Sequence, residues 1–144
     1  MKLVTLIFVF LLSSIASADI SGTALIVDGD TITISGNKIR LSGIDTPEQN
    51  QTCRRAGITW RCGYEATETL RNWTYTKEVR CIGDTKDRYG RLIANCFVDG
   101  YNVNARLVYE VLALAYRKYS KQYIPEEDKA RAAEVTAKIS KTLE

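Results

Sequence analysis

The sequence predicts an α+β fold in which short strands come first and helices dominate the end. Runs rich in β-branched residues, separated by Gly, Asn and Asp turn signals, fill residues 23–44. Apolar residues at helical spacing follow in residues 64–75, and a second pair of strand patterns follows that helix. The last forty or so residues lack strand patterns. These three observations indicate one compact domain with a mixed core.

The first three strands form a predicted meander. Residues 23–28 and 31–35 are joined by the turn signal Asp28-Gly29-Asp30. A second turn at Gly36-Asn37 leads into residues 38–44, in which Ile39 and Leu41 alternate with polar neighbours. We therefore expect three consecutive antiparallel strands.

The next segment is predicted to be a loop followed by a helix. Residues 49–61 are polar and lie between cysteines, which indicates a loop. In residues 64–75 the side chains of Ala66, Leu70 and Trp73 share one helical face. Residues 78–82 and 92–98 then flank a polar stretch ending in Tyr89-Gly90, which predicts a hairpin.

Two more helices complete the chain. Residues 101–112 predict one helix, and another is expected to begin at Pro125, because three acidic residues follow it in the first turn. Five strands with a helix between the third and the fourth are the order of an OB-fold. That fold is a five-stranded Greek-key β-barrel, here with three helices.

The first 18 residues resemble a signal peptide. Met1-Lys2 is followed by a short apolar run, and Ala16-Ser17-Ala18 fits a cleavage site. The run is short of the roughly 20 residues that a membrane span needs, although an uncut anchor is the alternative. We expect a mature domain of residues 19–144 that is secreted or periplasmic and no longer held at a membrane.

The charge balance excludes a strongly basic protein. Twenty Lys and Arg residues face 17 Asp and Glu residues, for a net charge of +3, and loss of Lys2 with the leader would lower it by one. Affinity for a nucleic acid would depend on local positive groups. The sequence contains no histidine, so any proton transfer would fall to a carboxylate or a metal-bound water.

Four cysteines predict two disulfides in an exported chain, although reduced buried thiols are the alternative. Structural zinc is excluded, because the chain has neither a C-x-x-C pair nor a histidine. We expect the pairs Cys53–Cys62, closing a short polar loop, and Cys81–Cys96, linking adjacent strands of the predicted hairpin.

Three short segments concentrate the charged residues, and each has an ordinary structural interpretation. Asp28-Gly29-Asp30-Thr31 can be a simple turn between strands. Thr46-Pro47-Glu48-Gln49 fits a capping box at the start of a helix. Asp87-Arg88-Tyr89-Gly90-Arg91 can be a solvated hairpin tip.

Taken together, these segments and the run from Arg40 to Glu48 resemble the staphylococcal nuclease family in order and spacing, over roughly residues 27–119. The resemblance implies the OB-fold barrel. It also implies functional roles for individual residues. The implied calcium ligands are the carboxylates of Asp30 and Asp45 and the carbonyl of Thr46, and the implied catalytic residues are Arg40, Glu48 and Arg91.

The resemblance further implies a calcium-dependent nuclease that hydrolyses DNA and RNA to products with 3′ phosphates. Such a protein would be a monomer with no stable protein partner. The implied substrate-binding residues are Tyr89 and Tyr116, with Tyr119 nearby, although ordinary packing is an alternative role for these rings. The competing hypothesis is a non-catalytic OB module that binds nucleic acid or protein. The presence of all five charged site residues favours the enzyme.

The sequence departs from the family pattern at three places. Val111 stands where relatives usually carry a glycine after the helix, so we expect a different helix exit. The chain lacks the Gly-x-Trp ending of many relatives. The loop between Cys53 and Cys62 is an elaboration on the staphylococcal form.

Overall fold

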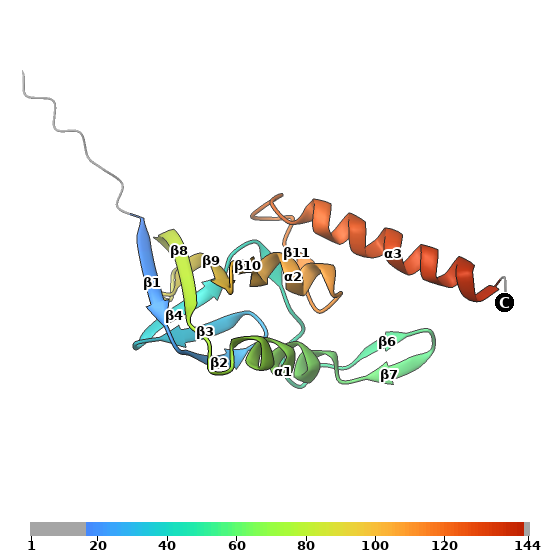
Figure 1. Ribbon diagram of the computed structural model, residues 1–144, viewed down its shortest axis with the longest axis horizontal. Helices are drawn as coiled ribbons and strands as arrows, with labels where there is room; N and C mark the ends of the chain where they lie inside the picture. The colour runs from blue at the N-terminus through green and yellow to red at the C-terminus, as the bar shows by residue number, and fades with distance from the viewer. Residues whose placement is uncertain (1–16, 143–144) are drawn as a thin grey trace, which may run out of the picture.

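The computed structural model describes residues 17–142, with side chains through Glu134. Residues 1–16, most of the predicted leader, lie outside this range. Figure 1 shows a curled sheet with α1 and α2 beside it, while α3 and the β6–β7 hairpin extend from the body. Within the described range, no helix is both long enough and apolar enough to cross a membrane.

The main sheet contains all five predicted strands and two further ones, β1 and β10. Its order is β1-β8-β9-β4-β3-β2, with β10 beside β9, and only the β4–β9 pair is parallel. The strands are β1 (Ala18–Gly22), β2 (Ala24–Asp28), β3 (Thr31–Ile34), β4 (Asn37–Leu41), β8 (Val79–Lys86), β9 (Leu92–Val98) and β10 (Tyr101–Asn102).

The two ends of this sheet, β1 and β2, are consecutive in the chain. The segment bends at Gly22, so that β1 pairs with β8 and β2 pairs with β3. A Cβ atom at Gly22 would lie 3.0 Å from Cγ2 of Ile34, so the bend requires a residue that has no side chain. The curled sheet and its three helices form the predicted α+β OB-fold; the strand pattern missed β1.

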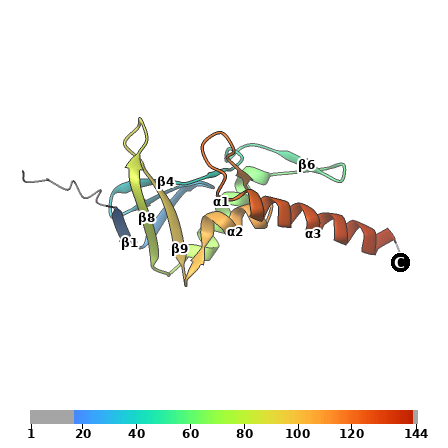
Figure 2. The same cartoon turned by 90° about the horizontal axis from the view of Figure 1, so that it is seen from above.

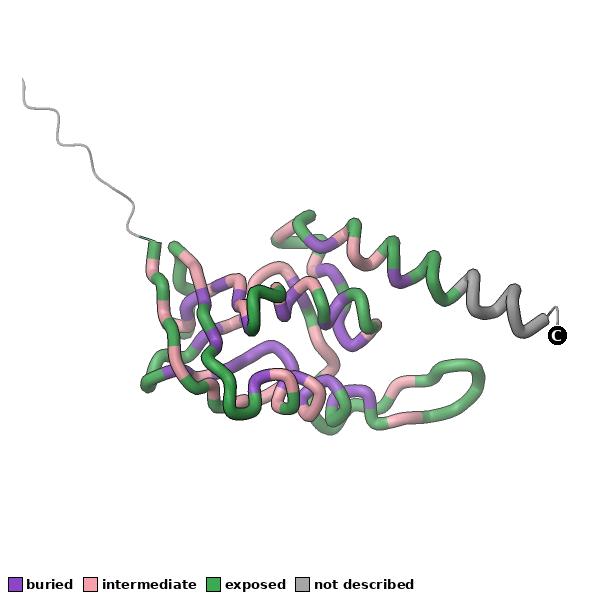
Figure 3. Tube along the Cα trace, in the orientation of Figure 1, coloured by how far each residue is buried: buried purple, intermediate pink, exposed green. Residues whose placement is uncertain are grey.

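The core lies between the sheet and the helices, where the buried segments gather in Figure 3. Strand β9 alternates as expected for a sheet with one buried face. The buried apolar side chains of the sheet include those of Ile32, Ile34, Ile39, Leu41, Val79, Leu92 and Val98. Helix α1 adds Ala66 and Leu70, and α2 adds Leu107 and Val108.

The three helices start within two residues of their predicted positions. They are α1 (Cys62–Thr74), α2 (Val103–Tyr109) and α3 (Ile124–Thr142). The side chain of Asn102 caps α2 by accepting a hydrogen bond from the Ala105 N–H at 3.1 Å. Helix α3 has acidic residues in its first turn, as the sequence pattern indicated, although these are two of the three expected, Glu126 and Glu127.

The predicted loop at residues 49–61 is wrong in part, because it contains a small hairpin. Strands β6 (Cys53–Arg55) and β7 (Ile58–Trp60) pair antiparallel around Ala56-Gly57. Both turn residues have positive φ, +49° and +81°, as in a two-residue hairpin turn. The pattern was missed because Ala-Gly lacks the Asn or Asp that normally marks such a turn. Figure 2 shows β6 projecting from the body.

The third predicted strand is interrupted. Gly43 has φ +72°, which ends β4 and starts the short strand β5 (Ile44–Asp45). Strand β5 pairs with β11 (Leu114–Ala115) and thus leaves the main sheet. Gly43, which lies inside the predicted strand of residues 38–44, is therefore the boundary between two strands.

Both predicted disulfides are present. Cys53 and Cys62 have Cα atoms 5.6 Å apart and close the base of the β6–β7 hairpin against α1. Cys81 and Cys96 lie directly opposite each other on β8 and β9, with Cα atoms 4.1 Å apart. The first staples a projecting arm, and the second lies in the core.

The expectation of a different helix exit at Val111 is wrong, because α2 ends in an ordinary helix-terminating motif. The N–H of Leu112 donates to the Leu107 carbonyl at 2.9 Å, and the N–H of Val111 donates to that of Val108 at 3.1 Å. This is a Schellman motif, with Val111 at φ +61° in the place that glycine favours. Valine, a β-branched residue, thus adopts a conformation that is strongly unfavourable for such side chains.

Candidate active site

Asp30 lies at the end of the β2–β3 turn, against the segment that follows β5. Its N–H donates to Oδ1 of Asp28 at 3.0 Å, which fixes the turn. A Cβ atom at Gly29 would lie 2.8 Å from Oγ1 of Thr46, so glycine permits this close approach. The Thr46 N–H donates to Oδ2 of Asp30 at 3.3 Å. The turn and the Thr46 segment therefore meet at the Asp30 carboxylate.

Arg40 links two carboxylates, one from the β2–β3 turn and one from β5. Its Nη1 lies 2.7 Å from Oδ2 of Asp30, and its Nη2 lies 3.5 Å from Oδ1 of Asp45. Thr31, next to Asp30, is the direct partner of Arg40 across β3 and β4. Nη1 is buried and has no aligned hydrogen-bond acceptor in the described structure. The guanidinium is therefore held by charge, with donor capacity left for another anion.

The environment of Asp30 favours a nearby cation. Burial raises the pKa of its carboxyl above the ordinary value, and the negative charge of Asp28 acts in the same direction. The charge of Arg40 and the Thr46 N–H oppose that rise. A buried carboxylate of this kind is stabilised in its charged form by positive charge close to it.

The residues present fit a weakly held calcium ion. Asp30 and Asp45 converge on one guanidinium, and carboxylate and carbonyl oxygens are the ligands that calcium prefers. Among the residues that the structure describes, no three or more His, Cys, Asp or Glu side chains gather into one metal site, so an ion here would depend on two carboxylates and a carbonyl. A calcium ion here would have few protein ligands and would keep several positions for water and phosphate.

Arg91 is held by an acid of its own turn. Oδ2 of Asp87 accepts a hydrogen bond from Nε of Arg91 at 2.6 Å. Oδ1 of Asp87 accepts from the N–H groups of Tyr89 and Arg91 at 2.9 and 3.0 Å. Partial burial opposes ionisation of Asp87, but these hydrogen bonds outweigh it and lower the pKa of its carboxyl.

Tyr89 covers part of the same turn. It is 69% exposed, and the Arg91 guanidinium carbon lies 5.5 Å from the centre of its ring. Arg88 donates a hydrogen bond to the Tyr89 hydroxyl at 2.7 Å. The turn therefore presents two guanidinium groups and an accessible aromatic ring together.

Glu48 lies on an irregular segment, and the capping-box interpretation of residues 46–49 is wrong, since no helix begins there. Its N–H donates to Oε1 of Gln51 at 3.2 Å, and its carbonyl accepts from the Gln51 N–H at 2.7 Å. The Gly63 N–H donates to the Gln51 carbonyl at 3.3 Å. A Cβ atom at Gly63 would lie 1.7 Å from the Glu48 carbonyl oxygen. The first turn of α1 thus supports the segment that carries Glu48.

The Glu48 carboxylate is exposed and, among the described contacts, is paired with neither Arg40 nor Arg91. The structure therefore brings Asp30, Arg40, Asp45 and Thr46 into direct contact. Arg91 and Glu48 stand on separate supports. The supporting roles of Gln51 and Gly63 were missed, because neither residue carries the chemistry that a motif search seeks.

Asn104 is another residue that the sequence patterns missed. It is fully buried and donates to the carbonyls of Ser42 and Ala94 at 3.0 and 3.1 Å. Its Oδ1 accepts from the Cys96 N–H at 3.1 Å. These bonds join α2, β9 and the segment between Arg40 and Asp45. Its position four residues before the buried Val108 was the available signal.

Tyr116 is brought beside the strand of Asp45. Strand β11 pairs with β5, and the Tyr116 N–H donates to the Gly43 carbonyl at 2.9 Å. Its ring contacts that of Tyr119 edge to face, with centroids 4.8 Å apart. Tyr119 is 70% exposed, so this pair presents an aromatic edge to solvent.

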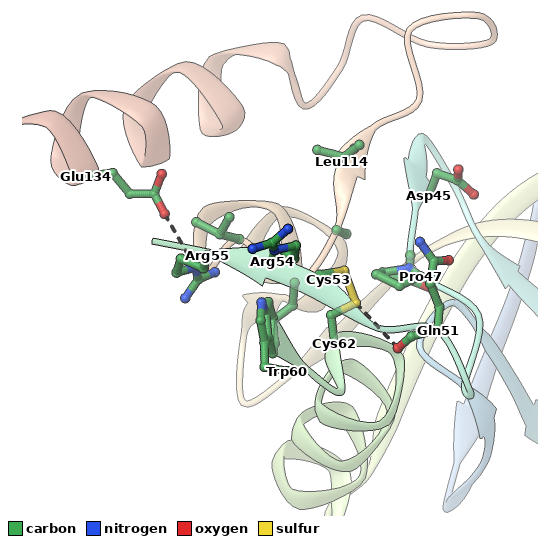
Figure 4. A pocket seen from close by; sticks show the side chains of 14 residues that line it. Asp45, Pro47, Gln51, Cys53, Arg54, Arg55, Trp60, Cys62, Leu114 and Glu134 are labelled. Atoms are coloured by element: carbon green, nitrogen blue, oxygen red, sulfur yellow. Dashed lines mark hydrogen bonds and ion pairs between the residues drawn. A yellow bond between two sulfur atoms is a disulfide. The ribbon is translucent and has the colours of Figure 1, made fainter. Parts of the chain in front are cut away.

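A cavity of about 400 Å³ begins at the metal-ligand candidates and runs toward the β6–β7 hairpin. Figure 4 shows Asp45, Pro47 and Gln51 on one side and Arg54, Arg55 and Trp60 on the other. Glu134 of α3 and Leu114 of β11 also line it. The cavity therefore extends the candidate site toward the β6–β7 hairpin.

The curled sheet and the cluster of acids and arginines at its strand ends define an OB-fold protein with an anion-handling site. The family model described as staphylococcal nuclease homologue matches residues 38–142. The chain belongs to the staphylococcal nuclease family. This membership places it among hydrolytic endonucleases.

Individual relatives agree with the family model. An uncharacterised endonuclease of Haemophilus influenzae is 33% identical over 140 residues, which cover 90% of this chain and 73% of that protein. A micrococcal nuclease of Shigella flexneri is 33% identical over 127 residues, covering 78% and 68%. The succinoglycan biosynthesis protein ExoI of Rhizobium meliloti is 38% identical over 96 residues, covering 65% of this chain and only 50% of that protein.

Proposed function

We propose that this protein is an exported, calcium-dependent nuclease that hydrolyses phosphodiester bonds of DNA and RNA and leaves 3′ phosphates. The observation that carries the proposal is the convergence of Asp30 and Asp45 on Arg40 at the strand ends. Two carboxylates that can hold a cation, beside a guanidinium, suit one anionic group with several oxygens.

In this proposal the carboxylates of Asp30 and Asp45 and the carbonyl of Thr46 hold calcium. Bound calcium supplies charge neutralisation and Lewis acidity to the phosphodiester. Arg40 and Arg91 bind phosphate oxygens through their planar forks. Their hydrogen bonds strengthen as negative charge grows on the equatorial oxygens in the transition state.

Glu48 orients the attacking water and accepts its proton. The water oxygen forms a bond to phosphorus as its proton passes to Glu48, the bond from phosphorus to the 5′ oxygen breaks, and the 5′ oxygen takes a proton from solvent. The phosphate stays on the 3′ oxygen. The exposed position of Glu48, outside the Arg40 ion pairs, supports its availability for this step.

The test is cleavage of single-stranded DNA, duplex DNA and RNA by the purified protein, with calcium and with excess chelator. We expect cleavage of all three only with calcium, and product ends that carry 3′ phosphates by mass spectrometry. Asp30→Ala and Asp45→Ala should abolish cleavage while the domain stays folded. Asp128→Ala, which removes an exposed acid of α3, is the matched control.

The alternative, a non-catalytic OB module, gives a different result. Such a protein would bind oligonucleotides and cleave none of them at any calcium concentration. Full cleavage in chelator would instead support the nuclease activity and contradict its dependence on calcium.

A further inference from the structure

We infer that the β6–β7 hairpin and the adjoining cavity form a second binding site for a single nucleic-acid strand, beyond the scissile phosphate. This inference rests on the proposed function, because it assigns the path of the substrate outside the reacting centre. Tyr89, Arg91 and the β8–β9 turn do not take part in this second site.

The hairpin is a local concentration of positive charge on a chain with little net charge. Arg54, Arg55 and Arg61 lie between Glu48 and Glu65, and no acidic residue intervenes. All three arginines are exposed. The net charge of +3 for the whole chain gives no general attraction for a polyanion, so binding depends on such local groups.

The cavity connects this charge to the candidate active site. Its volume of about 400 Å³ extends from Asp45 and Thr46 to Arg54 and Arg55. Pro47, Leu112 and Leu114 add apolar wall, and Leu114 is 62% exposed. Guanidinium groups above an apolar wall suit the phosphates and the flat bases of an unpaired strand.

Arg55 is held in place by its surroundings. The Arg55 guanidinium carbon lies 4.8 Å from the centre of the Trp60 ring. The Cys53–Cys62 disulfide fixes the base of the hairpin. A fixed arm costs less entropy on binding than a free loop.

The direction of the strand follows from the arrangement of the elements. Figures 1 and 2 both place the β8–β9 hairpin and the β6–β7 hairpin on opposite sides of α1. A strand that reaches Arg91 at one end can therefore leave along the cavity at the other. The second site takes the nucleotides on the side of the scissile phosphate away from Tyr89.

Glu134 offers a way to test the site by a gain of binding. Its Oε1 lies 3.9 Å from Nε of Arg55, across the cavity (Figure 4). A phosphate bound to Arg55 would approach this carboxylate, so Glu134 opposes binding. Glu134→Gln should remove that opposition without removing a positive group.

The experiment measures binding and cleavage with two substrates. Fluorescence anisotropy in chelator reports binding of a single-stranded DNA of about 16 nucleotides, the upper site size of one OB-fold. Cleavage with calcium is then compared between this strand and a dinucleotide. Binding without calcium keeps this test separate from the proposed catalysis, since an inactive protein still gives an affinity.

The variant Arg54→Ala/Arg55→Ala should weaken binding of the long strand on the order of tenfold and flatten the salt dependence by about 0.7 in log–log slope for each arginine. The ratio of kcat/KM for the long substrate to that for the dinucleotide should fall by a similar factor. Glu134→Gln should tighten binding of the long strand. The control Lys77→Ala/Arg80→Ala removes two exposed positive charges at and just before the start of β8 and should leave the ratio unchanged.

Equal affinity of the wild type and Arg54→Ala/Arg55→Ala for the long strand would overturn the second site. The same loss on the dinucleotide and the long strand would also overturn it, because the arginines would then act at the scissile phosphate. Absence of cleavage by the wild type, with binding intact, would refute the proposed function alone.

Discussion

The site is assembled from two regions with different supports. Asp30, Arg40 and Arg91 belong to strands or turns of the main sheet, whose hydrogen-bond ladder and buried side chains fix their positions. Glu48 belongs to a segment outside any helix or strand, held by Gln51, by close contact with Gly63 and by the Cys53–Cys62 disulfide nearby.

The difference indicates that charge stabilisation is built into the fold, whereas the proposed proton acceptor is attached to it. Changes in the sheet should affect stability and site geometry together. Changes around the Glu48 segment should affect catalysis with smaller effects on global stability.

The largest effect is expected from the two arginines of the sheet region. Arg40→Ala and Arg91→Ala should each lower kcat by about 10²–10³, because each loses one preorganised electrostatic contact. Arg91→Lys should be nearly as damaging, since an ammonium group cannot reproduce the planar fork. Single-turnover cleavage and oligonucleotide binding separate the effects on rate and on affinity.

For these variants, a loss of binding in proportion to the loss of rate would contradict a role in the transition state.

Glu48→Gln extends the comparison to the other region. It keeps the shape of the side chain and should also be severely slowed.

The next effect tests the support of Glu48 directly. A Cβ at Gly63 would lie 1.7 Å from the Glu48 carbonyl oxygen, so Gly63→Ala must displace the Glu48 backbone. A displacement of about 1 Å can cost 10²-fold in rate. We expect kcat to fall by that order while oligonucleotide affinity in chelator changes little.

Gly57→Ala is the matched control for Gly63→Ala. Gly57 lies in the turn of the neighbouring β6–β7 hairpin, and a Cβ atom there would meet no atom within 4 Å, although its φ of +81° adds local strain. If Gly57→Ala and Gly63→Ala reduced kcat equally, general loosening of the hairpin would explain both, and the specific support of Glu48 would be wrong.

The two disulfides compare the regions in terms of stability. Replacing Cys81 and Cys96 by alanine removes a buried link and should lower the free energy of unfolding by about 3 kcal/mol, from the chain entropy of a 15-residue separation. Replacing Cys53 and Cys62 should cost less, because the hairpin then gains freedom in the native state too. Denaturant unfolding measures both differences.

Activity should show the opposite order in these two double variants. Below the unfolding transition, loss of Cys53–Cys62 should lower kcat more than loss of Cys81–Cys96 does. A larger activity loss for the core pair would mean that the sheet, and not the hairpin base, controls Glu48.

The sequence predicted the sheet region better than the attached region. In β4, Ile39 and Leu41 alternate with more exposed neighbours because one face of the strand is buried, so the sequence pattern reports the structure. Asp30 and Arg40 lie beside or on the predicted strands, so their positions could be predicted with them. Short strands such as β5 and β11 carry no period to recognise, since two residues cannot alternate.

Long-range contacts explain the remaining misses. Gly63 and Asn104 act through atoms of residues 15 and 62 positions away, such as the Glu48 and Ser42 carbonyls. No local pattern marks such contacts. The β6–β7 hairpin was missed for a local reason, because Ala56 at positive φ is an uncommon choice in a turn.

The smallest effect concerns Val111, at the junction between α2 and the attached region. Its φ of +61° places a β-branched side chain in the left-handed conformation, and strain of this kind costs of order 1–3 kcal/mol. Val111→Gly should relieve that strain but make the unfolded chain more flexible and remove a half-buried side chain from the cavity wall. We therefore expect a net stabilisation of about 1 kcal/mol, the lower end of that range, measured as a higher denaturant midpoint at unchanged slope. Val111→Ala is the control, because it shortens the side chain and keeps the strain of a Cβ atom. If alanine stabilises as much as glycine does, the benefit comes from side-chain volume in the cavity wall, and the Schellman exit is not strained by valine.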